Sequence, residues 1–79
     1  MENIEIKERI RKILIRVLKH ENFEMNDEMS AKDVAGWDSL THMVIITEIE
    51  DDFKVKFKLK ELNKLKNLSS LVELVKSKL

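Results

Sequence analysis

Apolar residues recur every three or four positions in three segments of the chain. A spacing of three and four places the apolar side chains on one face of a helix. In the first segment this spacing predicts a helix over residues 4 to 19, with Asn3 as its N-cap and Glu5 in its first turn. The residues that form its apolar stripe are Ile6, Ile10, Ile13, Leu14 and Val17.

Two later segments continue the pattern. They predict helices over Ser39–Phe53 and Leu68–Lys78, the second of them capped by Asn67. Residues 20 to 37 lose the period and gather Asn, Asp, Ser and Gly, which indicates a long connection. The apolar residues expected to hold this connection against the core are Phe23, Met25, Met29 and Val34.

The stretch KVKFKLKELNKLK, residues 54 to 66, alternates like a strand and then changes to helical spacing. A single strand without a partner cannot satisfy its backbone. We therefore expect extended chain, with Val55, Phe57 and Leu59 buried between solvated lysines, followed by a short helix near residues 59 to 65. The predicted fold is all-α: one domain over residues 1 to 79, a small four-helix bundle with a long first loop and a short third helix.

Length and composition narrow the function. A chain of 79 residues buries only about 60 to 65% of its unfolded surface, which leaves no room for a deep catalytic cavity and argues against an enzyme. The chain has no cysteine, so a disulfide scaffold and a thiolate metal site are excluded, and we expect no metal. No apolar run is long enough to span a bilayer, and MENIEIKERI lacks the basic start of a signal peptide. We expect a soluble, cytoplasmic monomer.

The net charge of zero hides a segregated pattern. Residues 1 to 19 carry +3, residues 20 to 53 carry −9 and residues 54 to 79 carry +6. A nucleic-acid-binding protein concentrates positive charge around its functional motif, whereas the motif described next lies in the acidic block. The chain is therefore not expected to bind nucleic acid. A polyanion site on KVKFKLK is the open alternative to plain solvated lysines.

The motif GWDSL, residues 36 to 40, stands where an apolar helix begins. Asp38 can accept hydrogen bonds from the first turn as the N-cap, which leaves Ser39 as the first helical residue with a free hydroxyl. Ser39 then lies at the positive end of the helix dipole, which favours an attached or bound phosphate. Gly36 lets the chain turn, and Trp37 can anchor the entry of the helix. The alternative is that Ser39 is itself the cap and nothing more.

The segment GWDSLTHMVIITEIEDDFKVKF, followed by the capped last helix KNLSSLVELV, resembles the acyl carrier protein family over the whole chain. The resemblance rests on the D-S-L motif of Asp38, Ser39 and Leu40 at the start of the second helix. It implies that Ser39 bears a 4′-phosphopantetheine arm, attached from coenzyme A by a phosphopantetheinyl transferase with a divalent metal. It also implies that acyl-loading and acyl-processing enzymes are the partners, and that the cargo is a thioester.

The helix over Ser39–Phe53 has two apolar faces, and a small bundle can bury only one. We assign the larger set to the core: His42, Ile45, Ile46, Ile49 and Phe53. The opposite set then forms an exposed docking patch near Ser39, unless the third helix covers it: Leu40, Met43, Val44 and Thr47.

Acidic residues on this helix could steer basic partners, or could simply be solvated. They are Glu48, Glu50, Asp51 and Asp52. His42, one turn after Ser39, is either a neighbour of the arm's phosphate or a plain, partly packed residue.

Two rival functions are open. A hydrolase built from Asp38, Ser39 and His42 would crowd all three groups at one helix end, with nothing left to form an oxyanion hole. The second rival is a carrier-like bundle without the arm that serves only as a docking module. The cargo is undetermined, because fatty acyl, polyketide, aminoacyl and D-alanyl carriers share this architecture.

Overall fold

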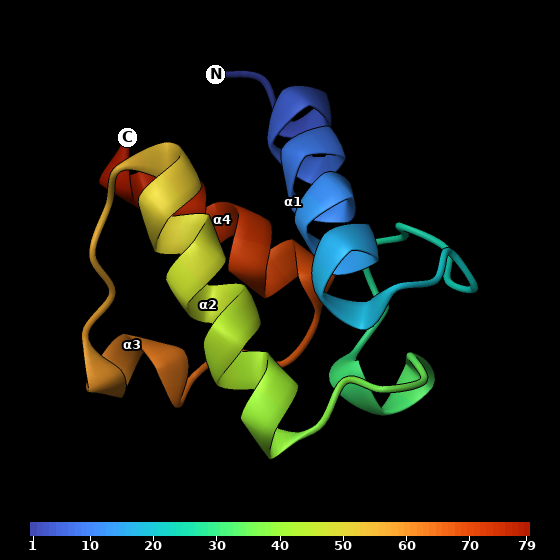
Figure 1. The fold of residues 1–79 in the computed structure, drawn as a ribbon. Helices are drawn as coiled ribbons and strands as arrows, with labels where there is room; N and C mark the ends of the chain where they lie inside the picture. Colours follow the sequence, from blue (N-terminus) through green and yellow to red (C-terminus); the bar gives the residue numbers. More distant parts are fainter.

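The computed structural model describes residues 1 to 79 and contains helices but no strands. The elements follow in the order α1 (Asn3–Leu18), the short 3₁₀ helix η1 (Ala31–Asp33), α2 (Ser39–Phe53), α3 (Leu59–Leu62) and α4 (Leu68–Lys78). Figure 1 shows α1, α2 and α4 around a common interior, with α3 at one end of the bundle. The predicted all-α fold is confirmed, and the bounds of α2 and α4 agree with the prediction.

The start of α1 differs from the prediction. Asn3 is already helical and Glu2 is the N-cap, so the assignment of Asn3 as cap is wrong. The backbone N–H of Glu2 donates to a carboxylate oxygen of Glu5 at 3.4 Å. An acid three residues after the cap favours this arrangement, because its side chain reaches back to the cap's own N–H. At the other end, Lys19 adopts a left-handed conformation with φ of 63° and its N–H donates to the carbonyl of Ile15.

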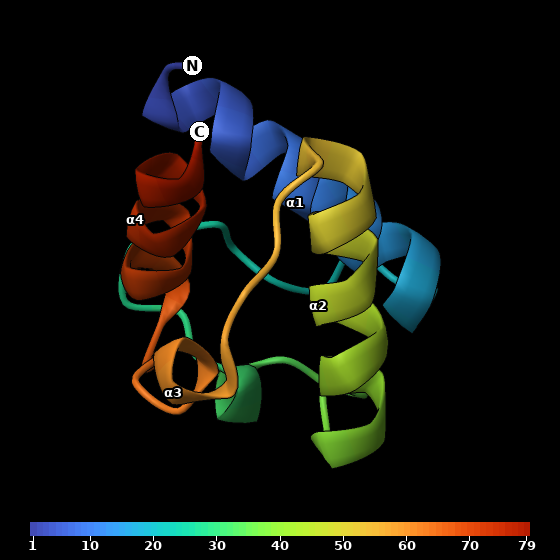
Figure 2. The same cartoon turned by 90° about the vertical axis from the view of Figure 1, so that its left-hand side faces the viewer.

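The core consists of one buried face from each long helix. Burying one valine, leucine, isoleucine or phenylalanine side chain contributes about 1.5 to 3 kcal/mol to the free energy of unfolding, relative to leaving it exposed. Figure 2 shows α1 crossing over the space between α2 and α4, so its buried face contacts both. The buried residues of the helices are Ile6, Ile10, Ile13, Leu14, Ile45, Ile46, Ile49, Phe53, Leu68, Leu71, Val72 and Val75.

The long connection after α1 is held by its own apolar side chains and by backbone hydrogen bonds. Met29 and Val34 are buried, and Phe23 and Met25 pack against the core as partly buried residues, as expected. The N–H of Leu68 donates to the carbonyl of Met29 at 2.7 Å, which ties the start of α4 to the connection. Residues 20 to 37 are therefore fixed against the bundle rather than merely linking two helices.

The segment before α3 differs from the predicted alternation. Val55 is buried and Phe57 is partly buried, but Leu59 is 74% exposed, so its predicted burial is wrong. The physical reason is that α3 begins at Leu59 and the two-residue period of extended chain ends at Lys58. The helix itself ends at Leu62, earlier than expected. None of the helices combines the length and the apolar character that crossing a membrane would require.

Candidate functional site at the start of helix α2

Asp38 caps α2 as the sequence predicts. One of its carboxylate oxygens accepts hydrogen bonds from the backbone N–H groups of Leu40, at 2.9 Å, and Thr41, at 3.0 Å. The bond from the Thr41 N–H is the main cause that lowers the pKa of the Asp38 carboxyl below its ordinary value of 3.8. Asp38 is therefore an ionised carboxylate at neutral pH, fixed in place beside Ser39.

Thr41 completes the cap from the other side. The N–H of Asp38 donates to the Thr41 hydroxyl oxygen at 2.8 Å, and that hydroxyl donates to the carbonyl of Gly36 at 2.6 Å. This reciprocal arrangement is a capping box in which threonine takes the place usually held by Glu or Gln. Sequence reasoning missed it, although the spacing of Asp38 and Thr41 is the signal that could have found it.

Gly36 has a positive φ of 84°, a backbone conformation that residues other than glycine rarely adopt. A Cβ atom there would lie 3.6 Å from a methyl carbon of Leu18, an ordinary contact. The requirement for glycine therefore comes from the backbone conformation and not from lack of space.

Ser39 is the first residue of α2 and is exposed. Its hydroxyl takes no part in the cap, which Asp38 and Thr41 provide. The alternative that Ser39 is the cap is therefore wrong. The next three backbone N–H groups of α2 donate to Asp38, whereas the N–H of Ser39 has no partner within the protein. The site combines a free hydroxyl, a free N–H and the positive end of a 15-residue helix.

Trp37 and His42 form a pair that sequence reasoning did not foresee. The Trp37 indole N–H donates to His42 Nδ1 at 3.0 Å, and the two rings are stacked with centroids 6.1 Å apart. His42 is partly buried rather than a full core residue, so its assignment to the core is corrected to the core edge. Burial lowers the pKa of the His42 imidazole below its ordinary value of 6.5. The neutral ring holds its proton on Nε2, because Nδ1 accepts from Trp37.

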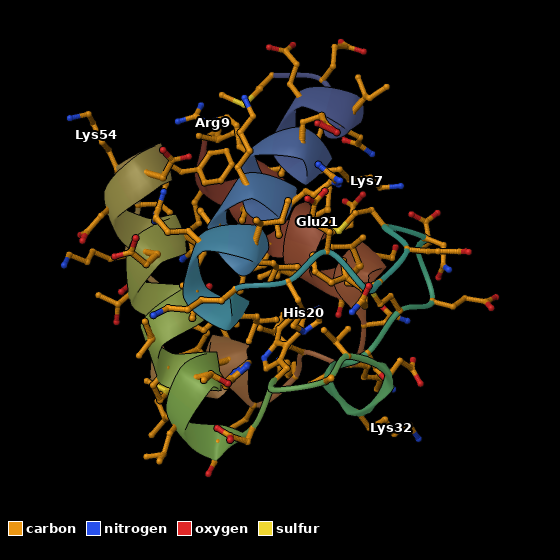
Figure 3. All side chains as sticks on the ribbon, turned by 45° about the vertical axis from the view of Figure 1, so that its right-hand side comes forward. Lys7, Arg9, His20, Glu21, Lys32 and Lys54 are labelled. Atoms are coloured by element: carbon orange, nitrogen blue, oxygen red, sulfur yellow. The ribbon has the colours of Figure 1, made fainter.

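His20 fixes the chain that leads into the motif. Its Nδ1 accepts from the N–H of Asn22 at 3.0 Å, and its Nε2 lies 2.6 Å from the carbonyl oxygen of Ala35. The ring also packs edge-on against Phe23, with centroids 5.7 Å apart. Figure 3 shows His20 between the end of α1 and the segment that precedes α2. Since Ala35 precedes Gly36, this contact helps to set the position at which α2 begins.

The predicted docking patch is exposed. Leu40, Met43 and Val44 are 79%, 52% and 49% exposed, and we call these three residues the α2 patch. Thr47 is exposed as well, and its hydroxyl donates to the carbonyl of Met43 at 2.9 Å. The alternative that the third helix covers this face is wrong.

The predicted steering acids are largely engaged within the chain. Glu48 forms an ion pair with Arg16 of α1. Asp52 pairs with Arg9 at 2.8 Å, and the same guanidinium donates to the Asp52 carbonyl and lies over the Phe53 ring (Figure 3).

Two acids remain on this part of α2. A carboxylate oxygen of Glu50 accepts the N–H of Phe57 at 2.8 Å, so Glu50 fixes the chain that follows α2. Asp51 is exposed and makes no ion pair. Only one of the four acids is thus fully available to a partner. No cluster of His, Asp and Glu side chains forms a metal site.

Comparison with known proteins agrees with this geometry. A family model described as a phosphopantetheine attachment site matches residues 8 to 75. The fold is similar to the solution NMR structure of a holo acyl carrier protein from Geobacter metallireducens, with a TM-score of 0.85 and 38% sequence identity. That similarity covers 92% of this chain and 84% of the other. The chain therefore belongs to the family of carrier proteins that contain a phosphopantetheine attachment site.

Proposed function

We propose that Ser39 is the residue to which the 4′-phosphopantetheine arm of this acyl carrier protein is attached. The observation that carries the proposal is the exposed Ser39 hydroxyl on the first residue of α2, free of the capping hydrogen bonds made by Asp38 and Thr41. The residue lies inside the region that the family model matches. Leu40 completes the motif on the exposed face of the helix.

The residues around Ser39 fit a phosphodiester-linked arm. The unpaired Ser39 N–H and the helix dipole favour a phosphate group at this point. The capping box, the glycine turn and the His20 contact make the base of the arm rigid. His42 is one turn away, where Nε2 rather than the occupied Nδ1 could donate to the phosphate. A flexible arm on a rigid base presents its thioester to successive enzymes at an effective concentration of up to about millimolar.

The partners that this chemistry requires are a phosphopantetheinyl transferase, which supplies the arm from coenzyme A, and enzymes that load and process the acyl group. The α2 patch and Thr47 supply an exposed surface next to Ser39 for these partners. Among the acids, Asp51 is free to steer a basic partner, whereas Glu48 and Asp52 must first release their arginines. The expected cytoplasmic location and monomeric state stay predictions.

A carrier needs no catalytic group of its own, and the site offers none in a working arrangement. His42 Nδ1 is occupied by Trp37, and no hydrogen bond joins the His42 ring to the Ser39 hydroxyl. A catalytic Ser-His pair requires a hydrogen bond between the serine hydroxyl and a free ring nitrogen of the histidine, so that the ring can accept the proton. We therefore assign the chain a carrying role rather than an enzymatic one.

Incubation of the purified chain with coenzyme A, Mg²⁺ and a phosphopantetheinyl transferase tests the proposal. We expect the intact mass to increase by one phosphopantetheine group, and peptide mapping to locate it on Ser39. Ser39→Ala should abolish the increase. Ser77→Ala, which removes another exposed hydroxyl on α4, should leave it unchanged. A chain that never gains the group would instead be the arm-less docking module, and a gain on the alanine variant would place the site elsewhere.

A further inference from the structure

The chain between α2 and α4 carries a set of lysines that no acid neutralises. Each of these lysines is exposed and none forms an ion pair. The only acid among them, Glu61, is paired with Lys78 of α4 at 2.8 Å and also accepts the N–H of Lys58. We call these residues the lysine ridge: Lys54, Lys56, Lys58, Lys60, Lys64 and Lys66.

The distribution of ion pairs makes the ridge different from the rest of the surface. Four basic residues of α1 pair with acids of the long connection or of α2. Two of those pairs neutralise Glu48 and Asp52 on the side of α2 that faces α1. On α2 itself Asp51 stays unpaired, whereas the segment between α2 and α4 carries unpaired charge of positive sign only.

The lysine ridge begins at the end of the functional helix and continues through α3. Figures 1 and 2 show the chain turning back after α2 and leading to α3, which is level with the first half of α2 and, in Figure 2, lies below α4. The exposed Leu59 lies within the ridge, between Lys58 and Lys60. An alternation of solvated lysines with residues packed on the core accounts for Val55, which is buried, and Phe57, which is partly buried. It does not account for Leu59, which is itself exposed.

We propose that the α2 patch, Leu59 and the lysine ridge together form a docking surface for enzymes whose entrance for the arm is rimmed by carboxylates. The inference rests on the proposed function of Ser39 and names the chemistry of its partners. Apolar residues in the centre with charges at the rim are the usual anatomy of a protein interface. The charge of the ridge attracts acidic partners and repels basic ones, which gives both a faster encounter and selectivity. This is the reverse of the steering expected from the acids of the sequence.

Other polyanions fit the surface less well than a protein does. Single-stranded nucleic acid is bound by stacking on exposed aromatic rings, and none of the four aromatic residues of this chain is exposed. An anionic bilayer would be repelled by the ionised Asp38 and by Asp51, which flank the α2 patch along the chain. A protein surface can place its carboxylates opposite the lysines alone.

The test is the loading of Ser39 by the phosphopantetheinyl transferase of the same organism, followed at low ionic strength. We compare the double variant Lys60→Glu/Lys64→Glu with Lys12→Glu/Lys32→Glu, which makes the same change of charge at exposed, unpaired lysines elsewhere. In Figure 3, Lys32 and Lys54 extend from opposite sides of the molecule, so this control includes a lysine far from the ridge. We expect kcat/KM to fall about tenfold or more for the ridge variant and less than about twofold for the control, with kcat little changed.

The outcomes separate this inference from the proposed function. If the wild-type chain does not load, the proposed function fails. If it loads and the ridge variant loads as fast or faster, only the docking inference fails. Lys60→Ala/Lys64→Ala gives a milder second variant, and circular dichroism with urea denaturation checks that every variant is folded. Binding of the wild type to phosphatidylglycerol vesicles or to a single-stranded DNA oligomer, lost in the ridge variant, would overturn the choice of a protein partner.

Discussion

Val44 and Ile45 are neighbours in sequence but lie on different faces of α2, about 100° apart around the helix axis. Val44 is 49% exposed in the α2 patch, whereas Ile45 is fully buried with 0% exposure. We predict that Val44→Glu lowers the free energy of unfolding by no more than about 1 kcal/mol. About half of the contribution of a buried valine is lost, while glutamate is the better helix former and keeps its charge in water. Ile45→Ala should cost about 2 to 5 kcal/mol, because it removes buried methyl groups and leaves a cavity.

These differences are measurable for a chain of this size. At about 2.1 cal/mol/K per residue, 79 residues have an unfolding entropy of about 170 cal/mol/K. A change of 1 kcal/mol therefore shifts Tm by about 6 °C, and Ile45→Ala should shift it by about 12 °C or more. The total stability expected for 79 residues is about 4 to 12 kcal/mol, so the alanine variant loses a large part of it.

Urea denaturation followed by circular dichroism measures the stability, and the transferase reaction measures docking. We expect the midpoint of Val44→Glu to stay near that of the wild type, with an unchanged slope, while kcat/KM for arm loading falls. A drop in midpoint as large as that of Ile45→Ala would show that Val44 is buried and would refute the docking face. Unchanged stability together with unchanged kinetics would show that Val44 is exposed but takes no part in docking.

Three further predictions concern the same site. Ser39→Ala should change the free energy of unfolding by less than about 1 kcal/mol, because Asp38 and Thr41 make the cap, and loss of cooperative unfolding would contradict this. The kcat/KM of arm loading should fall as the Debye length is shortened from about 30 Å to about 3 Å by salt, relative to a small-substrate control, and a flat profile would exclude electrostatic steering. Because burial lowers the pKa of His42, the native state binds fewer protons there than the unfolded state, so stability is complete above the ordinary value of 6.5 and declines as pH falls below it. His42→Gln should weaken this decline in urea midpoints, and identical profiles for the two proteins would contradict the assignment.

Much of the candidate site could be predicted because its interactions are local in sequence. The Asp38 cap depends on N–H groups two and three residues away, and Asn67 caps α4 by accepting the N–H of Ser70, three residues away. Such bonds form wherever a short polar side chain precedes an apolar helical period. The bounds Ser39–Phe53 and Leu68–Lys78 followed from the same local chemistry.

The roles of other residues depended on neighbours that are distant in sequence. His42 is partly buried because Trp37 stacks on it and donates to it, which periodicity does not reveal. Glu48 and Asp52 lose much of their free charge to arginines 32 and 43 residues earlier in the chain. From the sequence these acids were predicted to steer basic partner proteins, because the sequence shows the charges but not the ion pairs that the fold forms with them.

The two apolar faces of α2 separate what the local sequence determines from what the tertiary packing determines. The sequence by itself determined that α2 is a helix with two apolar faces and that Ser39 begins it. Only the packing of α1 and α4 decided that Ile45, Ile46 and Ile49 are buried while the α2 patch stays exposed. The tertiary structure likewise left Leu59 exposed and the lysines of the ridge without ion pairs. Helix formation depends on residues three and four apart, whereas burial depends on which surfaces from distant segments fill the limited interior of a 79-residue bundle.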